Sequence, residues 1–331
     1  MRPDLLLFAA ELAKRGEAFV FATVVRRAPP SSARVGDAAL VTQDGVFHGW
    51  LGGSCTQPTV VREALRALAE GVPRLIALSA QPGSERRDGV AALPNTCFSG
   101  GSVDVYIEPV LPAPHLAVFG ASPVAQALAR LGKAMKFHVD VVDPDADRAA
   151  FPDADRVLAA LGSGQLGSGS SRPEMLAVVA TMGQRDEEAT AAAIALEPAY
   201  LGLVASRRRF AQIRERLTAL GIAQQALACI ASPTGLDIGA HTPEEIAVSI
   251  LAQIVQVRRA AVATRVAEHA AVERATEARD PICGMMVKTA GARHQHQHAG
   301  RTYYFCCDGC RELFAGDPDR YAAVAEGEAS A

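Results

Sequence analysis

The chain has 331 residues, of which 49% are hydrophobic and 21% charged, and its formal net charge is −3. This length is enough for two or three cores, because single hydrophobic cores stop growing near about 250–300 residues. The small net charge gives no general electrostatic reason to bind nucleic acid or an anionic membrane. Apolar runs such as LAVFGA fall far short of the roughly 20 residues that a membrane span needs, so we expect no span and a cytoplasmic protein.

Residues 1–112 predict an N-terminal α/β domain. Its opening segment has apolar residues at the spacing of a short amphipathic helix, and the β-branched run AFVFATVVRR predicts a strand. AALVT and VFHGW flank Asp44-Gly45, which is typical of a β-hairpin turn. We further predict a helix over residues 58–71, a strand in SVDVYIEPV, and a boundary at Pro112.

Residues 113–259 have a different pattern, in which strands alternate with helices. LAVFGA, FHVDVVD, MLAVVAT and AYLGLVA predict buried strands, and amphipathic segments lie between them. This alternation favours a Rossmann-like, doubly wound parallel sheet. The Gly/Ser-rich segment 162–171 predicts a loop, and TPEE at 242–245 is a capping box that opens another helix.

The first strand–turn–helix of this region has the context of a dinucleotide-binding fingerprint. Gly120 ends the strand LAVFG, and Asp143 lies 23 residues further on, at the end of the next strand. In that fingerprint the acidic residue accepts a hydrogen bond from a ribose hydroxyl. The pattern here is G-x-S-x-x-A, so Ser122 replaces the glycine that lets the backbone approach a pyrophosphate. The fold type is therefore predicted, while NAD(P) binding and an empty or repurposed pocket are both left open.

Two glycine-flanked cysteines mark another candidate site. The run Gly52-Gly53-Ser54-Cys55 lies between a predicted strand and a predicted helix, and Cys97 lies in PNTCFSGG. Two glycines permit close backbone approach to a ligand, and a helix start favours an anion. Alone, each is a weak signal, because a cysteine at a tight turn is structural more often than not.

Basic residues near these segments are candidates for neutralising a phosphate. Arg34 lies in SSARVG, and Arg207 to Arg209 lie in ASRRRF. For Arg208 and Arg209 we favour a solvated helix face over a ligand contact.

The end of the chain is rich in cysteine. An Ala-rich, charged linker is predicted at 260–279, a small α+β module at 280–323 and a loose tail at 324–331. Three of its thiols, Cys283, Cys306 and Cys310, form a set that suits Zn²⁺ or Cu⁺. The alternatives are a redox pair of Cys307 with Cys310, and cysteines that are only packed in a small core.

Histidines alternate with glutamines in RHQHQHAG of the same module. On a strand, His294, His296 and His298 would all face one side. They could offer a fourth metal ligand, but we favour an exposed polar face.

This module resembles the YHS domain and the related TRASH-type metal-binding knuckles. The resemblance implies that Cys283, Cys306 and Cys310 are metal ligands. Cys307 stands where many relatives have a serine, so its role is open. The matching residues are Asp280, Pro281, Cys283, Gly284, Met285, Gly300, Tyr303, Tyr304, Phe305, Cys306, Cys310, Phe314, Asp317, Pro318 and Tyr321.

The body of the chain, from about Ala22 to Arg259, resembles the XdhC/CoxI family. The matching stretches include ATVVRRAPPSSARVGDAALVT, GWLGGSC, NTCFSGGSVDVYIEP, LAVFGASPVAQALARL, YLGLVASRRRF and GLDIGAHTPEEIAVSILAQIV, in the family's order. The resemblance implies a two-domain body that binds molybdenum cofactor and delivers it to an apo molybdenum hydroxylase of the xanthine or carbon monoxide dehydrogenase type. A cysteine desulfurase is the implied partner. The family's GGxC-type loop carries over to Cys55, but the acidic residue of its commoner GG-C-V-E-G pattern is absent here.

These observations favour a maturation chaperone over an enzyme. The alternatives are an NAD(P)-dependent oxidoreductase that uses Gly120 and Asp143, and a metal-trafficking or sensing adaptor centred on the C-terminal module. The hydroxylase that is served, the identity of the metal and the formation of a homo-oligomer are not readable from the sequence. The predicted cofactor-binding residues are Gly52, Gly53, Ser54, Cys55, Cys97, Gly120, Ser122 and Asp143, and the predicted metal ligands are Cys283, Cys306 and Cys310.

Overall fold

A computed structural model describes the chain over residues 3–53, 55–79, 87–94, 101–159, 174–284, 286–289 and 291–327. It divides into two compact units, one made of Met1–Ala13, Ala18–Leu111 and Val262–Ala331, the other of Lys14–Glu17 and Pro112–Ala261. The predicted site residues Ser54 and Cys97, and the Gly/Ser-rich segment 162–171, lie outside the described residues.

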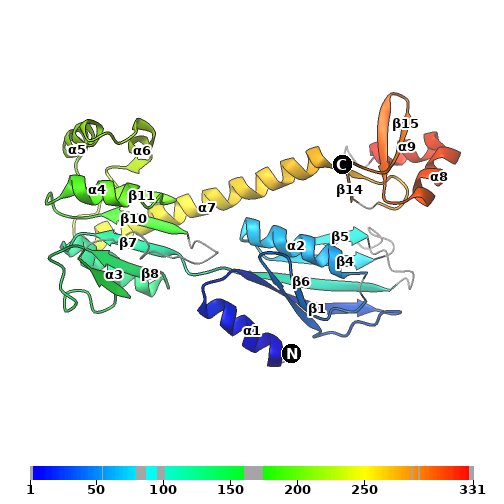
Figure 1. The fold of residues 1–331 in the computed structure, drawn as a ribbon, viewed down its shortest axis with the longest axis horizontal. Helices are drawn as coiled ribbons and strands as arrows, with labels where there is room; N and C mark the ends of the chain where they lie inside the picture. The colour runs from blue at the N-terminus through cyan, green and yellow to red at the C-terminus, as the bar shows by residue number, and fades with distance from the viewer. Residues whose placement is uncertain are drawn as a thin grey trace. The chain divides into compact units, whose positions relative to one another are not determined.

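The N-terminal domain is built on a sheet with the strand order β3-β2-β1-β6-β4-β5 (Figure 1). Neighbouring strands are antiparallel except for β4 and β5, which are parallel. The predicted hairpin forms from β2 and β3, with Gly45 of the turn at φ +83°. The strands are β1 (Phe19–Ala28), β2 (Ala38–Thr42), β3 (Phe47–Gly49), β4 (Arg74–Ser79), β5 (Val90–Pro94) and β6 (Ser102–Val110).

Helices α1 (Pro3–Lys14) and α2 (Gln57–Glu70) cover opposite faces of this sheet. Successive strand side chains point to opposite faces, so β1 supplies both cores. Val20 is in the cluster that includes α2, whereas its neighbour Phe19 is in the cluster with α1. Helix α2 ends at Gly71, whose left-handed φ of +68° closes the last turn, as the sequence predicts.

The second unit contains the predicted parallel sheet. Its strand order is β12-β11-β10-β7-β8-β9, and the recorded neighbours are all parallel. Because β7 lies between β8 and β10, the strand order reverses at β7, which is the topological switch point of a doubly wound sheet. The strands are β7 (His115–Phe119), β8 (His138–Val142), β9 (Arg156–Leu158), β10 (Met175–Val179), β11 (Tyr200–Leu203) and β12 (Ile230–Ala231).

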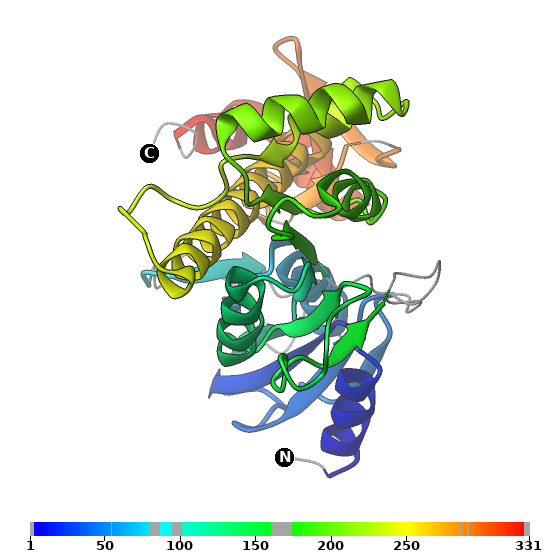
Figure 2. The same ribbon diagram turned by 90° about the vertical axis from the view of Figure 1, so that its left-hand side faces the viewer.

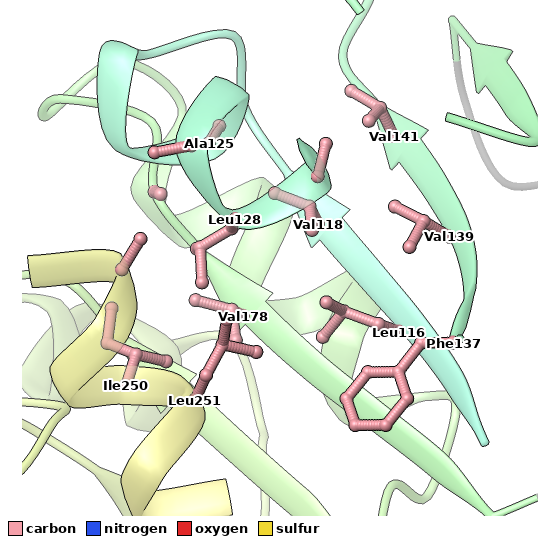
Figure 3. Close-up of a cluster of buried hydrophobic side chains, with 14 of the residues drawn as sticks. Leu116, Val118, Ala125, Leu128, Phe137, Val139, Val141, Val178, Ile250 and Leu251 are labelled. Atoms are coloured by element: carbon pink, nitrogen blue, oxygen red, sulfur yellow. The ribbon is translucent and has the colours of Figure 1, made fainter. Parts of the chain in front are cut away.

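Helices pack on both faces of the parallel sheet (Figures 1 and 2). On one face, Leu128 of α3 (Pro123–Ala134) and Ile250 of α7 (Pro243–Thr276) meet the strand residues Leu116 and Val178 (Figure 3). The other face is covered by α4 (Asp186–Ile194), α5 (Arg207–Ala219) and α6 (Gln224–Ala228).

Helix α7 begins at the predicted capping box. The Thr242 hydroxyl accepts a hydrogen bond from the backbone N–H of Glu245 at 3.3 Å, and the Glu245 carboxylate accepts one from the N–H of Thr242 at 3.0 Å. The helix continues through most of the segment 260–279 that was predicted as a linker.

Over Pro243–Glu268, α7 is also the one helix in the described part of the chain that has the length and apolar composition to cross a bilayer. Its residues Ala247, Ile250 and Ile254 are buried in the core of the parallel sheet. Packing on the sheet therefore accounts for these three apolar residues.

The C-terminal module consists of two small hairpins and two helices. Its core contains Tyr303, Phe305, Cys310 and Phe314. Strand β16 contains the run YYF, and helix α8 contains the run CRELF, in agreement with the predicted α+β module. The elements are β13 (Glu277–Arg279), β14 (Met286–Lys288), β15 (His294–His298), β16 (Arg301–Phe305), α8 (Asp308–Gly316) and α9 (Pro318–Gly327).

Candidate functional site

The predicted glycine–cysteine loop joins β3 to the start of α2. The Thr56 hydroxyl donates a hydrogen bond to the carbonyl of Gly53 at 2.9 Å, which closes a tight turn around residue 55. A Cβ atom on Gly53 would lie 3.1 Å from the Cys55 sulfur, so the partly exposed thiol lies directly against the glycine backbone. Cys55 thus comes just before the first turn of α2, and that turn contains no acidic residue.

Two glycines allow the segment 29–37 to pack against the neighbouring loops. Gly52 has φ +103°, and a Cβ there would lie 3.0 Å from the Cβ of the buried Ala33. A Cβ on Gly101 would lie 1.8 Å from the carbonyl oxygen of Pro30, a distance that no side chain could adopt. The segment therefore contacts both the Cys55 loop and the end of the segment that carried the Cys97 prediction. We call segment 29–37, the loop Gly52–Cys55 and Gly101 together the glycine clasp.

Arg34 lies next to Ala33 in the clasp. Its backbone N–H donates to the Asp37 carboxylate at 2.8 Å, which holds the turn. Its side chain is exposed, and in the described part of the chain the guanidinium has no ion-pair partner. This charge is therefore available to an anionic ligand.

Gly120 and Ser122 follow β7 in the parallel sheet, and their local roles are structural. A Cβ on Gly120, at φ +112°, would lie 2.5 Å from the carbonyl oxygen of Ala180, so the close approach of β7 and β10 already requires this glycine. The buried Ser122 hydroxyl accepts a hydrogen bond from the N–H of Ala125 at 3.1 Å and caps α3. The serine thereby uses one of the N–H groups that a pyrophosphate would otherwise bind.

Asp143 lies at the same edge, after β8, but its carboxylate is already engaged. It accepts a hydrogen bond from the backbone N–H of Asp145 at 2.8 Å. The guanidinium of Arg185 lies 3.9 Å from the Asp143 carboxylate and hydrogen-bonds to Asp145. Arg185 follows β10 and Asp143 follows β8, so the contact between their side chains crosses the end of β7, which lies between these two strands. A dinucleotide would bind at this end of the sheet. The structure brings Gly120, Ser122 and Asp143 together, and NAD(P) binding there remains a prediction.

The prediction that Arg209 lies on a solvated helix face is wrong. Its Nε lies 2.9 Å from the carboxylate of Asp186, which is buried, and the same guanidinium donates to the carbonyl of Gly183 at 3.3 Å. The buried carboxylate requires a cation, and Arg209 supplies it. Arg207 and Arg208 are exposed.

The three thiols predicted as metal ligands converge in the C-terminal module. The sulfur atoms of Cys283 and Cys306 are 3.5 Å apart, and those of Cys306 and Cys310 are 3.7 Å apart. Together with Asp280, they offer four ligand atoms that all lie within 4.8 Å of one another. We call these three thiols the thiol cluster.

Asp280 organises the thiol cluster through the backbone, a role that the sequence analysis missed. One carboxylate oxygen accepts the N–H groups of Ile282 at 2.9 Å and Cys283 at 3.4 Å, and the other accepts that of Cys306 at 2.9 Å. The side chain is fully buried. Both oxygens are thus used to hold the two cysteine-bearing turns together, although Asp280-Pro281 entered the prediction only as part of the YHS resemblance.

The cysteines of the module differ in their acidity. Burial and the neighbouring Cys283 raise the pKa of the Cys306 thiol, and burial and the charge of Asp280 raise the pKa of Cys310. Cys307 is exposed at the start of α8, where the N–H of Cys310 lowers the pKa of its thiol. Burial therefore disfavours the thiolate form of two members of the thiol cluster, whereas the N–H of Cys310 favours the thiolate form of Cys307.

The histidines of β15 do not form the exposed face that we expected. Their rings are half-buried and the intervening glutamines are exposed. The His296 ring lies 5.6 Å from the ring of Phe314 on α8, and the His298 Nε2 lies 2.8 Å from the Asp319 carboxylate. The apolar ring of Phe314 accounts for this orientation. These histidines are not part of the metal-ligand group that the described residues form around Asp280.

Comparison with known protein families gives three matches, one in each predicted domain of the chain. The model for the XdhC and CoxI family matches residues 12–79, that for the XdhC Rossmann domain matches 116–254, and that for the YHS domain matches 278–325. The protein is therefore an XdhC/CoxI-type chain with a C-terminal YHS domain. It belongs to the XdhC and CoxI family, as the sequence resemblance indicated.

Individual relatives agree with this placement. An uncharacterized Escherichia coli protein, YqeB, is 34% identical over 76% of this chain and 45% of its own length. A Bacillus subtilis protein described as a probable subunit of xanthine dehydrogenase is 33% identical over 48% of this chain and 47% of its own length. The chain thus spans about half the length of these relatives. The molybdenum cofactor insertion chaperone PaoD of Escherichia coli is 23% identical over 77% of this chain and 88% of its own length.

Two further similarities concern the module and the overall structure. A copper-transporting P-type ATPase of Rhizobium leguminosarum is 45% identical over 51 residues, 15% of this chain and 6% of the ATPase. A crystal structure described as a xanthine dehydrogenase from Bacillus halodurans aligns with a TM-score of 0.38 at 21% identity, over 77% of this chain and 96% of that one.

Proposed function

We propose that this protein is a cytoplasmic maturation chaperone that binds molybdenum cofactor and delivers it to an apo molybdenum hydroxylase. Family membership and the similarity to PaoD support this role. The single observation that carries the assignment of the site is the glycine clasp, which combines a partly exposed thiol with the exposed guanidinium of Arg34, for which the described residues supply no ion-pair partner.

The clasp suits the chemistry of an anionic, soft-metal cargo. Arg34 and the start of α2 offer positive charge for a phosphate group. The Cys55 thiol is a soft ligand of the kind that such a metal accepts. Gly52 and Gly53 let Ala33 and the Cys55 sulfur pack closely against the loop, which fixes the position of the thiol. A chaperone needs no acid or base for turnover, which is consistent with the absence of an acidic residue in this loop.

The partners follow from the same proposal. An apo molybdenum hydroxylase of the xanthine dehydrogenase type would receive the cofactor, and a cysteine desulfurase would supply sulfur to the metal before delivery. The Bacillus subtilis relative, described as part of a xanthine dehydrogenase, supports the choice of hydroxylase class.

Cofactor retention by the full chain tests the proposal. Bound cofactor is quantified by pterin fluorescence after oxidative release. We expect Cys55→Ala and Arg34→Gln each to lower the affinity by about tenfold or more, because each removes a ligand or a charge at the clasp. Cys229→Ala is the matched control, because this exposed thiol is on α6's C-terminal side in the other unit. Equal retention by all three variants would remove the clasp assignment, and no retention by the wild-type chain would remove the chaperone role.

A second candidate function, holding a soft metal ion, is favoured by the geometry of the thiol cluster. Because both oxygens of Asp280 accept backbone N–H groups, the cluster offers three thiols and no free carboxylate. Three sulfur ligands suit Cu⁺, whereas structural Zn²⁺ usually takes four ligands. Metal analysis of the reduced full chain should find one copper per chain, lost in Cys310→Ser and kept in Cys307→Ser. Retention of copper by the Cys310 variant would contradict this assignment.

A further inference from the structure

A different group of metal-ligand side chains lies in the parallel sheet, away from the thiols. His115 and His138 are the first residues of β7 and β8 and are directly paired in the parallel register. Asp140 lies two residues further along β8 and therefore faces the same side of the sheet as His138. This group is at the amino ends of the strands, opposite to the edge that carries Gly120 and Asp143.

The three side chains converge on one another. The Nε2 atom of His115 lies 2.6 Å from one oxygen of Asp140, and the Nε2 atom of His138 lies 3.3 Å from the other. One ligand atom from each of the three residues lies within 4.8 Å of the others. His115 and Asp140 are buried, at 4% and 0% exposure, whereas the side chain of His138 is 42% exposed. The group thus has a rigid base and one side open to solvent.

The charges around this group are balanced by cations that are partly exposed. Asp140 accepts a hydrogen bond from the Nε of Arg156 at 2.9 Å, and the Arg156 side chain is 37% exposed. The Nδ1 atom of His138 lies 3.6 Å from Asp155, which hydrogen-bonds to Lys133 at 2.8 Å. A buried carboxylate requires a cation, and Arg156 supplies it through its Nε and Nη2 atoms.

We propose that His115, His138 and Asp140 form a site for a divalent transition metal ion such as Zn²⁺ or Co²⁺, in which Arg156 holds Asp140 when the metal is absent. Two imidazoles and a carboxylate suit borderline metals, so this site differs in preference from the thiol cluster. Asp155 faces the second nitrogen of His138, the position from which a carboxylate orients a metal-bound imidazole. The open side leaves room for water as a further ligand.

Titration of the reduced, metal-free full chain with Co²⁺ tests the site, because thiolate ligands add a charge-transfer band in the near ultraviolet and nitrogen or oxygen ligands do not. We expect His138→Asn to abolish one Co²⁺ equivalent that has visible d–d bands without thiolate charge transfer. His294→Asn, which changes a half-buried histidine of β15, should leave that equivalent intact. His138 is partly exposed, so its variant should fold, which circular dichroism checks.

A second variant tests the competition. Arg156→Gln removes the cation that occupies Asp140, so we expect the dissociation constant of the non-thiolate Co²⁺ to fall by roughly tenfold. The proposal is overturned if His138→Asn binds as much Co²⁺ as the wild type, or if neither the wild type nor Arg156→Gln shows bands without thiolate charge transfer.

Discussion

The glycine clasp and the thiol cluster both present cysteine sulfur, but they position it by different means. At the clasp, Cys55 lies against glycine backbone, and the neighbouring loops pack through Gly52 and Gly101. In the cluster, the buried Asp280 carboxylate accepts the N–H groups of two cysteines that lie 23 residues apart. An open loop with one thiol suits a cargo that must leave again. Three converging thiols suit a single soft metal ion.

The largest expected effect comes from removing the carboxylate that organises the cluster. Asp280→Ala leaves the buried N–H groups of Cys283 and Cys306 without an acceptor, which should destabilise the C-terminal module by about 3 kcal/mol or more. Limited proteolysis and metal content of the full chain measure this effect. Asp308→Ala is the control, because Asp308 is exposed and its carboxylate pairs with the side chains of Arg311 and His294. Similar behaviour of the two variants would show that Asp280 does not organise the cluster.

The next largest effect is expected from a substitution that disturbs the packing of the glycine clasp and changes no cysteine. Gly101→Ala would place a Cβ 1.8 Å from the Pro30 carbonyl oxygen, so the backbone must shift. We expect a loss of about 1–3 kcal/mol in the free energy of unfolding, together with weaker cofactor retention. Gly316→Ala is the control, because nothing lies within 4 Å of the position of its added Cβ. If Gly101→Ala keeps full retention, the packing of segment 29–37 is not part of the site.

The rate of alkylation should distinguish the exposed Cys307 from the thiols of the neighbouring cluster. Cys307 is exposed, and the N–H of Cys310 lowers the pKa of its thiol. Iodoacetamide should therefore alkylate Cys307 faster than Cys306 or Cys310 near pH 7. Peptide mass spectrometry after short exposures measures the order, and Cys307→Ser supplies the background. Faster alkylation of Cys310 than of Cys307 would contradict the lowered pKa of the Cys307 thiol.

The smallest expected effect concerns the first turn of α7, which belongs neither to the glycine clasp nor to the thiol cluster. Thr242→Ala removes the hydroxyl that caps α7 and should lower the free energy of unfolding by about 1 kcal/mol.

The N–H of Thr242 lowers the pKa of Glu245 from 4.5, so the carboxylate stabilises the folded state above that pH. This contribution is lost as the pH falls through the folded-state pKa. Acid titration monitored by circular dichroism should show that Glu245→Gln removes it, whereas an unchanged profile would exclude the capping interaction.

Local patterns predicted most of the fold. The β-branched run AFVFATVVRR predicted β1, alternation of apolar residues predicted β6, strand–helix alternation predicted the parallel sheet, and the motif at Thr242 predicted the start of α7. Each of these signals lies within a few residues along the chain. Composition alone left segment 260–279 open between a helical and a partly disordered linker, because it has few large apolar residues, and the structure has α7 through Thr276.

Contacts between distant residues were harder to predict. The pairing of Arg209 with Asp186 spans 23 residues, and that of His115 with Asp140 spans 25. No local spacing indicates them, because they depend on the register of neighbouring parallel strands and on loops that follow them. The inward orientation of the β15 histidines likewise depends on Phe314, which belongs to a later helix.

The hydrogen bonds of Asp280 have a consequence for the speed of metal exchange. They hold Cys283 and Cys306 in place through backbone atoms, so metal–sulfur bonds are not the only contacts that position the sulfur atoms. We therefore expect that an ion can enter or leave without unfolding the module. The rate of transfer to another soft ligand would be set by access to the sulfur atoms and the stepwise replacement of one thiolate by the next.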